Sequence, residues 1–347
     1  MLYEDELSLT EKIEKVATEI YGAASVTYDP AALKAIKKLE ELGFKNVYVV
    51  KEQEMPDSSF STVEYPNPED VKVFVMAQEL AAKVDADVLI GTDPDADRLG
   101  VLVKNADGSY DVLTGNQTGV LLADYILSST EIREGDFIVK SIVSTDLAQK
   151  IAASYGVKLY DVYTGFKYIA ERIRKHDGVD GRFLFGFEES YGCLPGAYAR
   201  DKDAVAATLL ICELVAVLKR KNMTQKDAVT GLYERFGYIA DKTVSLTMEG
   251  MDGMRKIKDI MEKVSKEPFK KICDTKVKAV RNYNTNTRTD LETGVTEPIG
   301  LDESNVLYFE LSGGGYFVIR PSGTEPKIKF YYSIPCESLE AGNEKID

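Results

Sequence analysis

The sequence is poor in the residues on which many catalytic and metal sites depend. Its 347 residues contain a single histidine, and the four cysteines are scattered without the close pairs that build zinc or redox sites. Reduced, structural thiols are therefore expected at Cys193, Cys212, Cys273 and Cys336. His176 lies in a polar stretch typical of a helix end and turn. Acid–base chemistry is thus expected to fall to lysines or carboxylates.

Positive charge and long apolar runs are also scarce. The chain has 57 acidic and 43 basic side chains, a formal net charge of −14. Because such a chain repels polyanions, neither nucleic acid nor a membrane surface is an expected partner, and an anionic ligand must meet a local cluster of Arg and Lys. No apolar run approaches the roughly 20 residues of a membrane span. The acidic start does not resemble a signal peptide, so a cytoplasmic protein is expected.

Length and a hydrophobic content of 44% predict several compact domains. Helix and strand signals alternate over the first two-thirds, a pattern that favours an α/β fold: two consecutive α/β units with mainly parallel mixed sheets. After about residue 240 the order changes to an α+β module, in which the polar segment 282–296 is expected to be an exposed loop. The predicted domains are 1–131, 132–238 and 239–347.

Three carboxylates at alternate positions follow the buried-type strand 87–90. Asp93, Asp95 and Asp97 repel one another unless a divalent cation binds, and hard oxygen ligands suit Mg²⁺. A calcium EF-hand loop is excluded, because Arg98 replaces its sixth-position glycine and Lys104 its bidentate glutamate. The alternative is a solvated acidic turn.

Two further charged loops follow along the chain. Residues 186–192 read Gly-Phe-Glu-Glu-Ser-Tyr-Gly, and such carboxylates and a hydroxyl suit sugar hydroxyls, although an ordinary strand-to-loop turn fits equally well. Residues 198–203 then lead into a long helix. Lys202, near this helix start and close to Arg200, is placed for a lowered pKa that favours proton transfer near neutrality. A solvated helix start is the plainer alternative.

The fourth constellation lies between two strands near the C-terminus. Residues 320–327 read Arg-Pro-Ser-Gly-Thr-Glu-Pro-Lys. A guanidinium, two hydroxyls and a glycine that frees backbone amides describe a phosphate-binding loop without a Walker lysine pattern. A plain hairpin connection is the alternative.

Together and in this order, four motifs closely resemble the α-D-phosphohexomutase family, in its phosphoglucomutase-like branch. They are Thr-Asp-Pro-Asp-Ala-Asp-Arg at 92–98, Thr-Gly-Phe-Lys at 164–167, Gly-Phe-Glu-Glu-Ser-Tyr-Gly at 186–192 and Arg-Pro-Ser-Gly-Thr-Glu-Pro at 320–326. The match covers nearly the whole chain. The resemblance implies an isomerase that shifts a phosphoryl group between O1 and O6 of a hexose phosphate, with glucose the expected hexose, through a hexose bisphosphate.

The resemblance also implies roles for individual residues. Asp93, Asp95 and Asp97 would hold Mg²⁺, Arg98 would lie beside a serine-borne phosphate, and Lys202 is the candidate general acid or base. The residues expected to contact the hexose phosphate or bisphosphate are Thr164, Gly165, Lys167, Glu188, Ser190, Arg200, Arg320, Ser322, Gly323 and Thr324.

The sequence departs from the family pattern in two places. Family members have four domains, and the first brings a Thr-Ala-Ser-His-Asn-Pro type loop with the phosphorylated serine, which has no counterpart here. Residues 21–28 also lack the usual Pro-Leu-His-Gly turn. A truncated form that is inactive in isolation is therefore expected. The alternatives are a non-catalytic sugar-phosphate-binding protein and a mutase acting on mannose or pentose phosphates; an Mg²⁺-dependent phosphatase is disfavoured by Ala96-Asp97 after the Asp-x-Asp pair.

Overall fold

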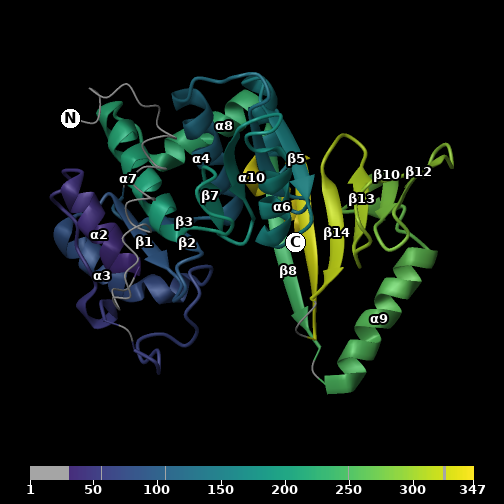
Figure 1. Cartoon of the computed structure of the whole chain (residues 1–347). Helices are drawn as coiled ribbons and strands as arrows, with labels where there is room; N and C mark the ends of the chain where they lie inside the picture. The colour runs from purple at the N-terminus through teal and green to yellow at the C-terminus, as the bar shows by residue number, and fades with distance from the viewer. Residues whose placement is uncertain (1–30, 56, 106, 249, 323–325) are drawn as a thin grey trace. The chain divides into compact units, whose positions relative to one another are not determined.

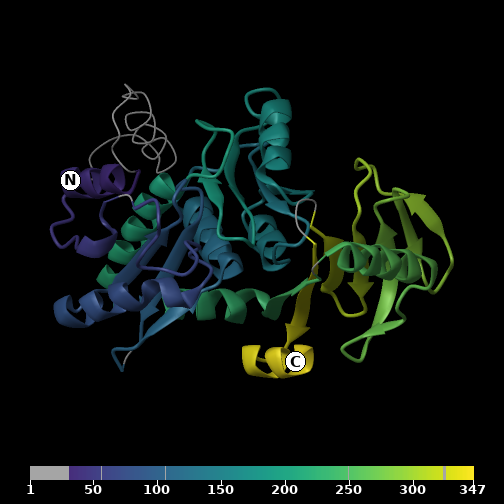
Figure 2. The same ribbon diagram turned by 90° about the horizontal axis from the view of Figure 1, so that it is seen from below.

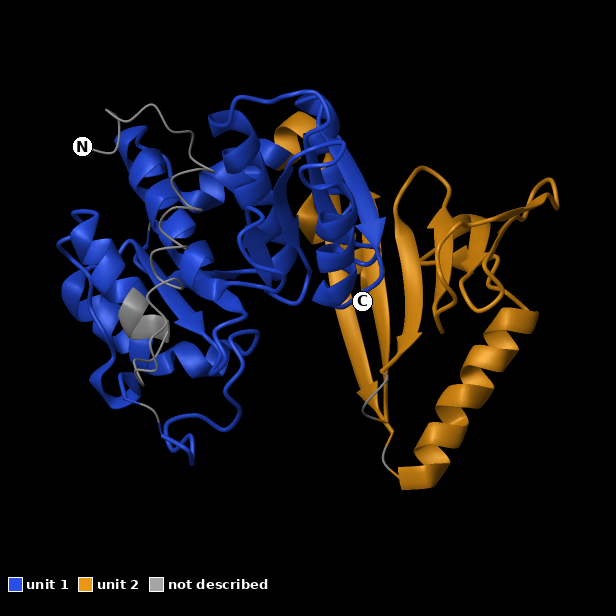
Figure 3. Cartoon of the chain, in the orientation of Figure 1, with its two compact units in different colours: residues 1–232 blue, residues 233–347 orange. Residues whose placement is uncertain are grey.

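A computed structural model describes residues 31–55, 57–105, 107–248, 250–322 and 326–347 (Figure 1). The chain divides into two compact units, Met1–Leu232 and Tyr233–Asp347 (Figure 3). The division falls a few residues before the expected boundary at 238/239. The further boundary expected at 131/132 lies inside the first unit, which holds two separate sheets, and it stays a prediction.

The first sheet of unit 1 has the order β1-β2-β3 and both of its pairings are antiparallel. Its strands are β1 (Val88–Thr92), β2 (Leu99–Lys104) and β3 (Tyr110–Leu113), preceded by η1 (Lys51–Gln53), η2 (Val71–Phe74) and α3 (Val75–Val84). Parallel pairing, expected here, is absent from these described strands. The reason is the short link 93–98, because parallel neighbours need a crossover of about a dozen residues or more. Residues 47–50, whose Val-Tyr-Val-Val run is typical of a strand, have no regular structure.

The second sheet of unit 1 has the order β5-β4-β6-β7, with β4 parallel to β5 and β6 and only β7 antiparallel. This is the mainly parallel mixed sheet that the sequence predicts. Its strands are β4 (Phe137–Ser141), β5 (Lys158–Val162), β6 (Phe183–Phe187) and β7 (Cys193–Pro195). Every residue of β4 and β6 is buried, as expected of parallel strands covered on both faces.

In the residues of unit 1 that the structure describes, six helices accompany α3. They are α2 (Ala31–Glu41), α4 (Gly115–Ser129), α5 (Leu147–Ser154), α6 (Phe166–His176), α7 (Ala204–Arg220) and α8 (Gln225–Phe236), the last of which runs on into unit 2. Thr114 and Gln117 form a reciprocal capping box that starts α4. Ile169 and Ile173 of α6 pack on Phe137 and Phe183, so α6 covers one face of the second sheet.

The described residues of unit 2 form one eight-stranded antiparallel sheet with two helices, an α+β arrangement as predicted. Its elements are β8 (Tyr238–Thr247), α9 (Gly250–Lys266), β9 (Lys271–Ile272), β10 (Thr275–Asn282), β11 (Thr287–Asp290), β12 (Thr296–Pro298), β13 (Leu307–Leu311), β14 (Tyr316–Pro321), β15 (Lys327–Cys336) and α10 (Leu339–Ile346). Ile257 and Met261 of α9 pack against Phe309 and Phe317, so α9 lies along one face of the sheet (Figure 2).

The expectation of an exposed loop over 282–296 is partly wrong. Residues 287–290 form β11, which pairs with β10 on one side and with β12 on the other. Arg288 of β11 reaches Glu310 of β13 through two hydrogen bonds of 2.8 Å. These long-range ion pairs stabilise strands in a segment whose composition is typical of turns. In the ranges that the structure describes, no helix combines the length and apolar character needed to cross a bilayer.

Candidate functional site

The acidic loop, residues 93–98, turns the chain from β1 back into β2. Asp93 holds the turn with one carboxylate oxygen, which accepts the backbone N–H groups of Asp97 and Arg98 at 3.0 Å each. Ala96 has a left-handed backbone with φ of 56°. This geometry gathers the three carboxylates, and one oxygen from each of Asp93, Asp95 and Asp97 lies within 4.8 Å of the others.

The electrostatics of this loop fit a cation. Burial raises the pKa of Asp93 to about 6, and the neighbouring carboxylates of Asp97 and Asp95 add to that rise, while the backbone N–H of Arg98 opposes it. Asp97 Oδ1 is buried and accepts no hydrogen bond in the described structure. An orphaned carboxylate oxygen among three close acids is costly unless a positive ion satisfies it, and hard oxygen ligands suit Mg²⁺.

Arg98 is tied to the acidic loop and to a neighbouring segment. Its Nε lies 3.5 Å from Asp93 Oδ2 and 3.7 Å from Asp97 Oδ1. Its terminal nitrogen donates to Glu69 at 3.2 Å. The guanidinium therefore offsets only part of the negative charge, and about a third of the side chain stays exposed at the rim of the loop.

Lys202 reaches the acidic loop from the start of α7. Its Nζ lies 2.5 Å from Asp97 Oδ2, and the two side chains are 17% and 23% exposed. The next residue, Asp203, caps α7 by accepting the backbone N–H groups of Val205 and Ala206, which fixes the direction from which Lys202 approaches. The lysine that the sequence singled out is thus placed beside an aspartate of the acidic loop.

The Glu188 loop, residues 188–192, follows β6. Glu188 is 5% exposed, and its Oε1 accepts the backbone N–H of Gly165 at 2.5 Å. Gly165 has φ of 112°, which favours glycine because a Cβ would be strained there. The Thr-Gly pair at 164–165 and the glutamate at 188, far apart in the sequence, therefore meet at the carboxyl ends of β5 and β6, which lie on either side of β4.

Backbone hydrogen bonds join these pieces within unit 1. The N–H of Leu99, just after the acidic loop, donates to the carbonyl of Tyr191 in the Glu188 loop at 2.9 Å. The N–H of Ala204, at the start of α7, donates to the carbonyl of Ala96 at the same distance. These bonds thus join the acidic loop to the Glu188 loop and to the start of α7, which carries Lys202, and the three form one constellation.

Sequence reasoning missed a buried support beneath the Glu188 loop. Glu189 accepts a hydrogen bond from the Ser141 hydroxyl at 2.8 Å, and its backbone N–H donates to the Ser144 hydroxyl at 3.1 Å. The carbonyl of Ser144 accepts from Lys140 Nζ at 3.0 Å. A lysine inside the mainly apolar run 137–143 was the available signal.

Lys140 is almost fully buried and is held by two aspartates. It is 1% exposed, with Nζ 2.8 Å from Asp161 Oδ1 and 3.6 Å from Asp146 Oδ1. Burial works against the charged amine, but the two carboxylates outweigh it and raise the pKa of Lys140. The ammonium is therefore a permanent part of the second sheet near neutral pH.

Two residues predicted to contact substrate lie at the surface of unit 1. Lys167 is exposed, with Nζ 4.9 Å from the ring centroid of Tyr168. Arg200 is exposed, and its guanidinium donates to the carbonyl of Ala199 at 2.9 Å. Ser190 is half-buried within the Glu188 loop. Neither of these two contacts, of Lys167 and of Arg200, reaches the acidic loop.

The Arg320 turn, residues 320–327, belongs to unit 2 and joins β14 to β15. The Arg320 guanidinium donates to the Tyr331 hydroxyl at 3.2 Å, and the backbone N–H of Ser322 donates to the carbonyl of Lys327 at 2.7 Å. Lys329 pairs across the strands with Arg320, a second cation that sequence reasoning missed. Alternation of Lys327 and Lys329 along one strand face was the signal. Gly323 and Thr324 lie outside the described residues.

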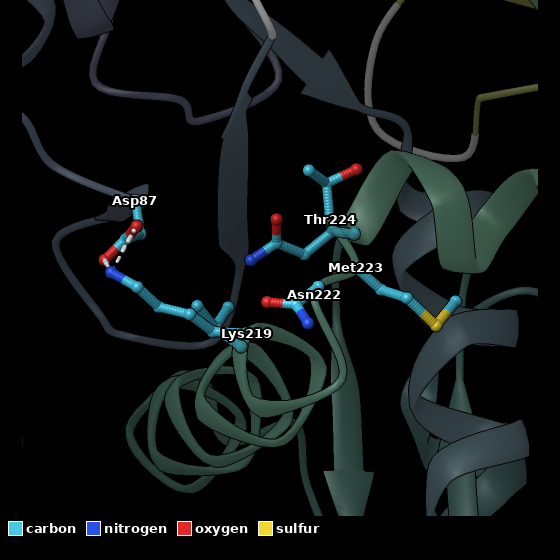
Figure 4. Close-up of a pocket in the computed structure, with 7 residues that line it drawn as sticks. Asp87, Lys219, Asn222, Met223 and Thr224 are labelled. Atoms are coloured by element: carbon cyan, nitrogen blue, oxygen red, sulfur yellow. Dashed lines mark hydrogen bonds and ion pairs between the residues drawn. The ribbon is translucent and has the colours of Figure 1, made fainter.

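A cavity of about 230 Å³ lies elsewhere in unit 1, at the junction of α7 and α8 (Figure 4). Lys219 and Asp87 both line it and form an ion pair, with Nζ 2.7 Å from Oδ2. Its lining includes Asn222, Met223 and Thr224, and none of the predicted site residues. The candidate site is therefore the constellation built on the acidic and Glu188 loops.

Comparisons with known proteins match most of the chain. The family model described as phosphoglucomutase/phosphomannomutase, alpha/beta/alpha domain II, matches residues 11–108, and that of domain III matches residues 114–236. A phosphoglucomutase of Staphylococcus epidermidis is 41% identical over 311 residues, which are 89% of this chain and 56% of that protein. A phosphoglucomutase of Staphylococcus aureus is 39% identical over 335 residues, 96% of this chain and 59% of that protein. The chain thus spans less than two-thirds of these relatives.

Solved structures show the same fold at low sequence identity. The open form of pp63/parafusin from Paramecium, a phosphoglucomutase, has a TM-score of 0.62 at 17% identity, over 98% of this chain and 61% of that one. A phosphoglucomutase/phosphomannomutase family protein from Burkholderia thailandensis has a TM-score of 0.58 at 15% identity, over 96% and 62%.

Proposed function

This chain belongs to the phosphoglucomutase/phosphomannomutase family of α-D-phosphohexomutases, and from this premise we propose that it forms the cation-, sugar- and phosphate-binding parts of a hexose phosphate mutase. The reaction moves a phosphoryl group between O1 and O6, through a hexose bisphosphate, with glucose as the hexose. The observation that carries the proposal is the constellation of Asp97, Lys202 and Glu188, which three separate segments bring together in unit 1.

The acidic loop has the donor set for the family's metal. Asp93, Asp95 and Asp97 would hold Mg²⁺, as their clustered oxygens and the orphaned Asp97 Oδ1 favour. When bound, the ion supplies positive charge that stabilises phosphoryl oxygens during transfer. Arg98 adds a fixed cation at the rim of the same loop, where a phosphate approaches.

The other side chains bind and orient the sugar. Glu188 offers buried carboxylate oxygens to sugar hydroxyls, and Thr164 and Ser190 offer hydroxyls from adjoining loops. Lys202 is the group in this constellation that can give a proton to, or take one from, a sugar oxygen. Lys167 and Arg200 contribute positive charge at the surface of unit 1.

The Arg320 turn would clamp the phosphate that does not react. Arg320 and Lys329 supply charge, and Ser322 with Gly323 and Thr324 supply hydroxyl and backbone donors. A phosphate held far from the reacting centre gives the substrate a handle in either of its two orientations.

Turnover tests the catalytic part of this proposal. The printed sequence contains no Thr-Ala-Ser-His-Asn-Pro type loop, so the isolated chain should bind hexose phosphate and turn it over poorly. Purified chain is incubated with glucose 1-phosphate, Mg²⁺ and glucose 1,6-bisphosphate, and glucose 6-phosphate is measured with a coupled dehydrogenase. Robust turnover that Asp95→Asn abolishes would support mutase chemistry but refute the expected inactivity.

A second candidate, a non-catalytic protein that binds sugar phosphates, is favoured by the two cations at the Arg320 turn, Arg320 and Lys329. Calorimetry separates the candidates by ligand: glucose, mannose and pentose phosphates are titrated in parallel into the chain and into Arg320→Ala. The proposal predicts binding of glucose 6-phosphate that Arg320→Ala weakens. Tighter binding of mannose or ribose phosphate would indicate that this sugar, and not glucose, is the substrate. If Arg320→Ala changes the affinity for none of the ligands, the proposed phosphate clamp is refuted.

A further inference from the structure

We propose that Lys202 is a built-in counter-ion of the acidic loop, which occupies part of the cation site until a divalent cation displaces it. Cation loading would then release the Lys202 amine for the substrate. This inference rests on the proposed function in one respect, that the acidic loop takes a metal.

The contacts of Asp97 carry the proposal. Lys202 Nζ lies 2.5 Å from Asp97 Oδ2, whereas Arg98 Nε stays 3.7 Å from Oδ1. Oδ1 itself is buried without a hydrogen-bond partner. One oxygen of a proposed metal ligand is thus taken by an amine and the other is left for a cation. The carboxylate is half satisfied, which is the state expected of a site that exchanges one positive partner for another.

The position of Lys202 is specified by its surroundings. Gly192 lies against the lysine stem, and a Cβ on that glycine would come within 2.2 Å of Lys202 Cδ. The backbone N–H of Lys202 donates to Asp201 Oδ1 at 2.8 Å, and Asp203 caps the helix that follows. Because Gly192 has no side chain, the stem of Lys202 has the space it needs for its amine to reach Asp97.

Two positive groups on one carboxylate compete. A divalent cation held by Asp93, Asp95 and Asp97 would lie within a few ångströms of the ammonium, where repulsion between charges in a partly buried site is strong. The cation must therefore exchange with Lys202 at Oδ2 or bind more weakly beside it. Because such coupling is reciprocal, a charge at Lys202 that weakens cation binding is itself displaced by the cation.

Calorimetric titration of Mg²⁺ tests this coupling without any measurement of turnover. Four proteins are compared near neutral pH: the unaltered chain, Lys202→Met, Lys202→Arg and Lys226→Met. Lys226 is a matched control, because its amine also pairs with an aspartate, Asp111, at 2.7 Å, but on β3 away from the acidic loop. Circular dichroism melts check that all four are folded.

The expected result is specific to Lys202. Lys202→Met should tighten Mg²⁺ binding about tenfold, as removal of a competing charge at short range implies. Lys202→Arg keeps the charge and should stay near the unaltered affinity, as should Lys226→Met. A second measurement follows acetylation of Lys202 by mass spectrometry, which should become several-fold faster when Mg²⁺ is added.

The outcomes separate this inference from the proposed function. Suppose that the unaltered chain binds Mg²⁺. If Lys202→Met then binds Mg²⁺ no more tightly, or if the rate of Lys202 acetylation is unchanged by Mg²⁺, the counter-ion role is refuted while the cation site stands. If neither protein binds Mg²⁺, the cation site of the proposed function fails and the counter-ion role fails with it. If Lys226→Met tightens Mg²⁺ binding equally, the effect comes from the net charge of the protein, and this result would also overturn the proposal.

Discussion

Replacing Lys140 by methionine should destabilise unit 1 by about 2–3 kcal/mol. The change removes the ammonium that pairs with Asp161 and Asp146 and that donates to the carbonyls of Ser141 and Ser144. Losing one partner of a fully buried pair costs about 3–5 kcal/mol. Here both aspartates are more than a third exposed, so water compensates them and lowers that cost to about 1–2 kcal/mol. The two buried carbonyls lose donors, at about 1 kcal/mol in total.

Urea unfolding at pH 7 measures this change, with Lys158→Met as the control. Lys158 lies on the neighbouring β5, is exposed and stands over the Tyr160 ring at 4.4 Å, so its loss should cost less than about 1 kcal/mol. Equal stability of Lys140→Met and the unaltered chain would refute the claim that this ion cluster supports the sheet.

The pH dependence of the same difference provides an internal check. The folded-state pKa of Lys140 is raised above its ordinary 10.5, so its contribution is fully present below the unfolded-state pKa. The contribution is lost as pH rises through the folded-state pKa. The stability gap between the unaltered chain and Lys140→Met should therefore be flat from pH 7 to about pH 10 and shrink above it. A gap that grows with alkaline pH would contradict the assignment.

Three further changes have defined outcomes. The pKa of Asp93 is about 6 without metal, so below that pH Mg²⁺ must displace a proton to bind. The Mg²⁺ affinity measured by calorimetry should therefore fall from pH 7 to pH 5. Asp93→Asn should bind Mg²⁺ more weakly and with less dependence on pH. Gly165→Ala should cost about 1–3 kcal/mol in urea unfolding because of its φ of 112°. Gly231→Ala inside α8, where a Cβ meets nothing within 4 Å, should instead stabilise the protein by about 0.5–1 kcal/mol. If Gly165→Ala were the more stable of the two variants, both predictions would be contradicted.

Local patterns in the sequence were sufficient to predict most elements and where the loops of the candidate site start. The apolar run 183–187 predicts a buried strand, and the structure has β6 over those residues with Glu188 directly after it. The helix end expected at His176 is also confirmed, where the ring stacks on Tyr160 at a centroid distance of 4.9 Å. These features depend on periodicity and on turn residues, which are set by residues close together in the sequence.

Features set by distant partners were not predictable in the same way. Pairing of Lys202 with Asp97 joins residues far apart in the sequence, and nothing near either residue indicates the other. Antiparallel pairing of β1 with β2 depended on the length of the acidic loop, which the alternation of helices and strands did not reveal. Strand β11 likewise pairs with β10, and its Arg288 bonds to Glu310 of β13, although the composition of the segment is typical of turns.

Calorimetry with glucose 6-phosphate tests most directly whether the chain binds hexose phosphate through the residues that the proposed function names. Glu188→Gln removes a charged acceptor in unit 1, and Arg320→Ala removes a charged donor in unit 2, and each should weaken binding about tenfold or more. Lys226→Met serves as the control and should leave affinity unchanged. Weakened binding in both variants is the predicted result. If either substitution leaves the affinity of the unaltered chain intact, that residue does not bind the hexose phosphate, and the proposed function is wrong.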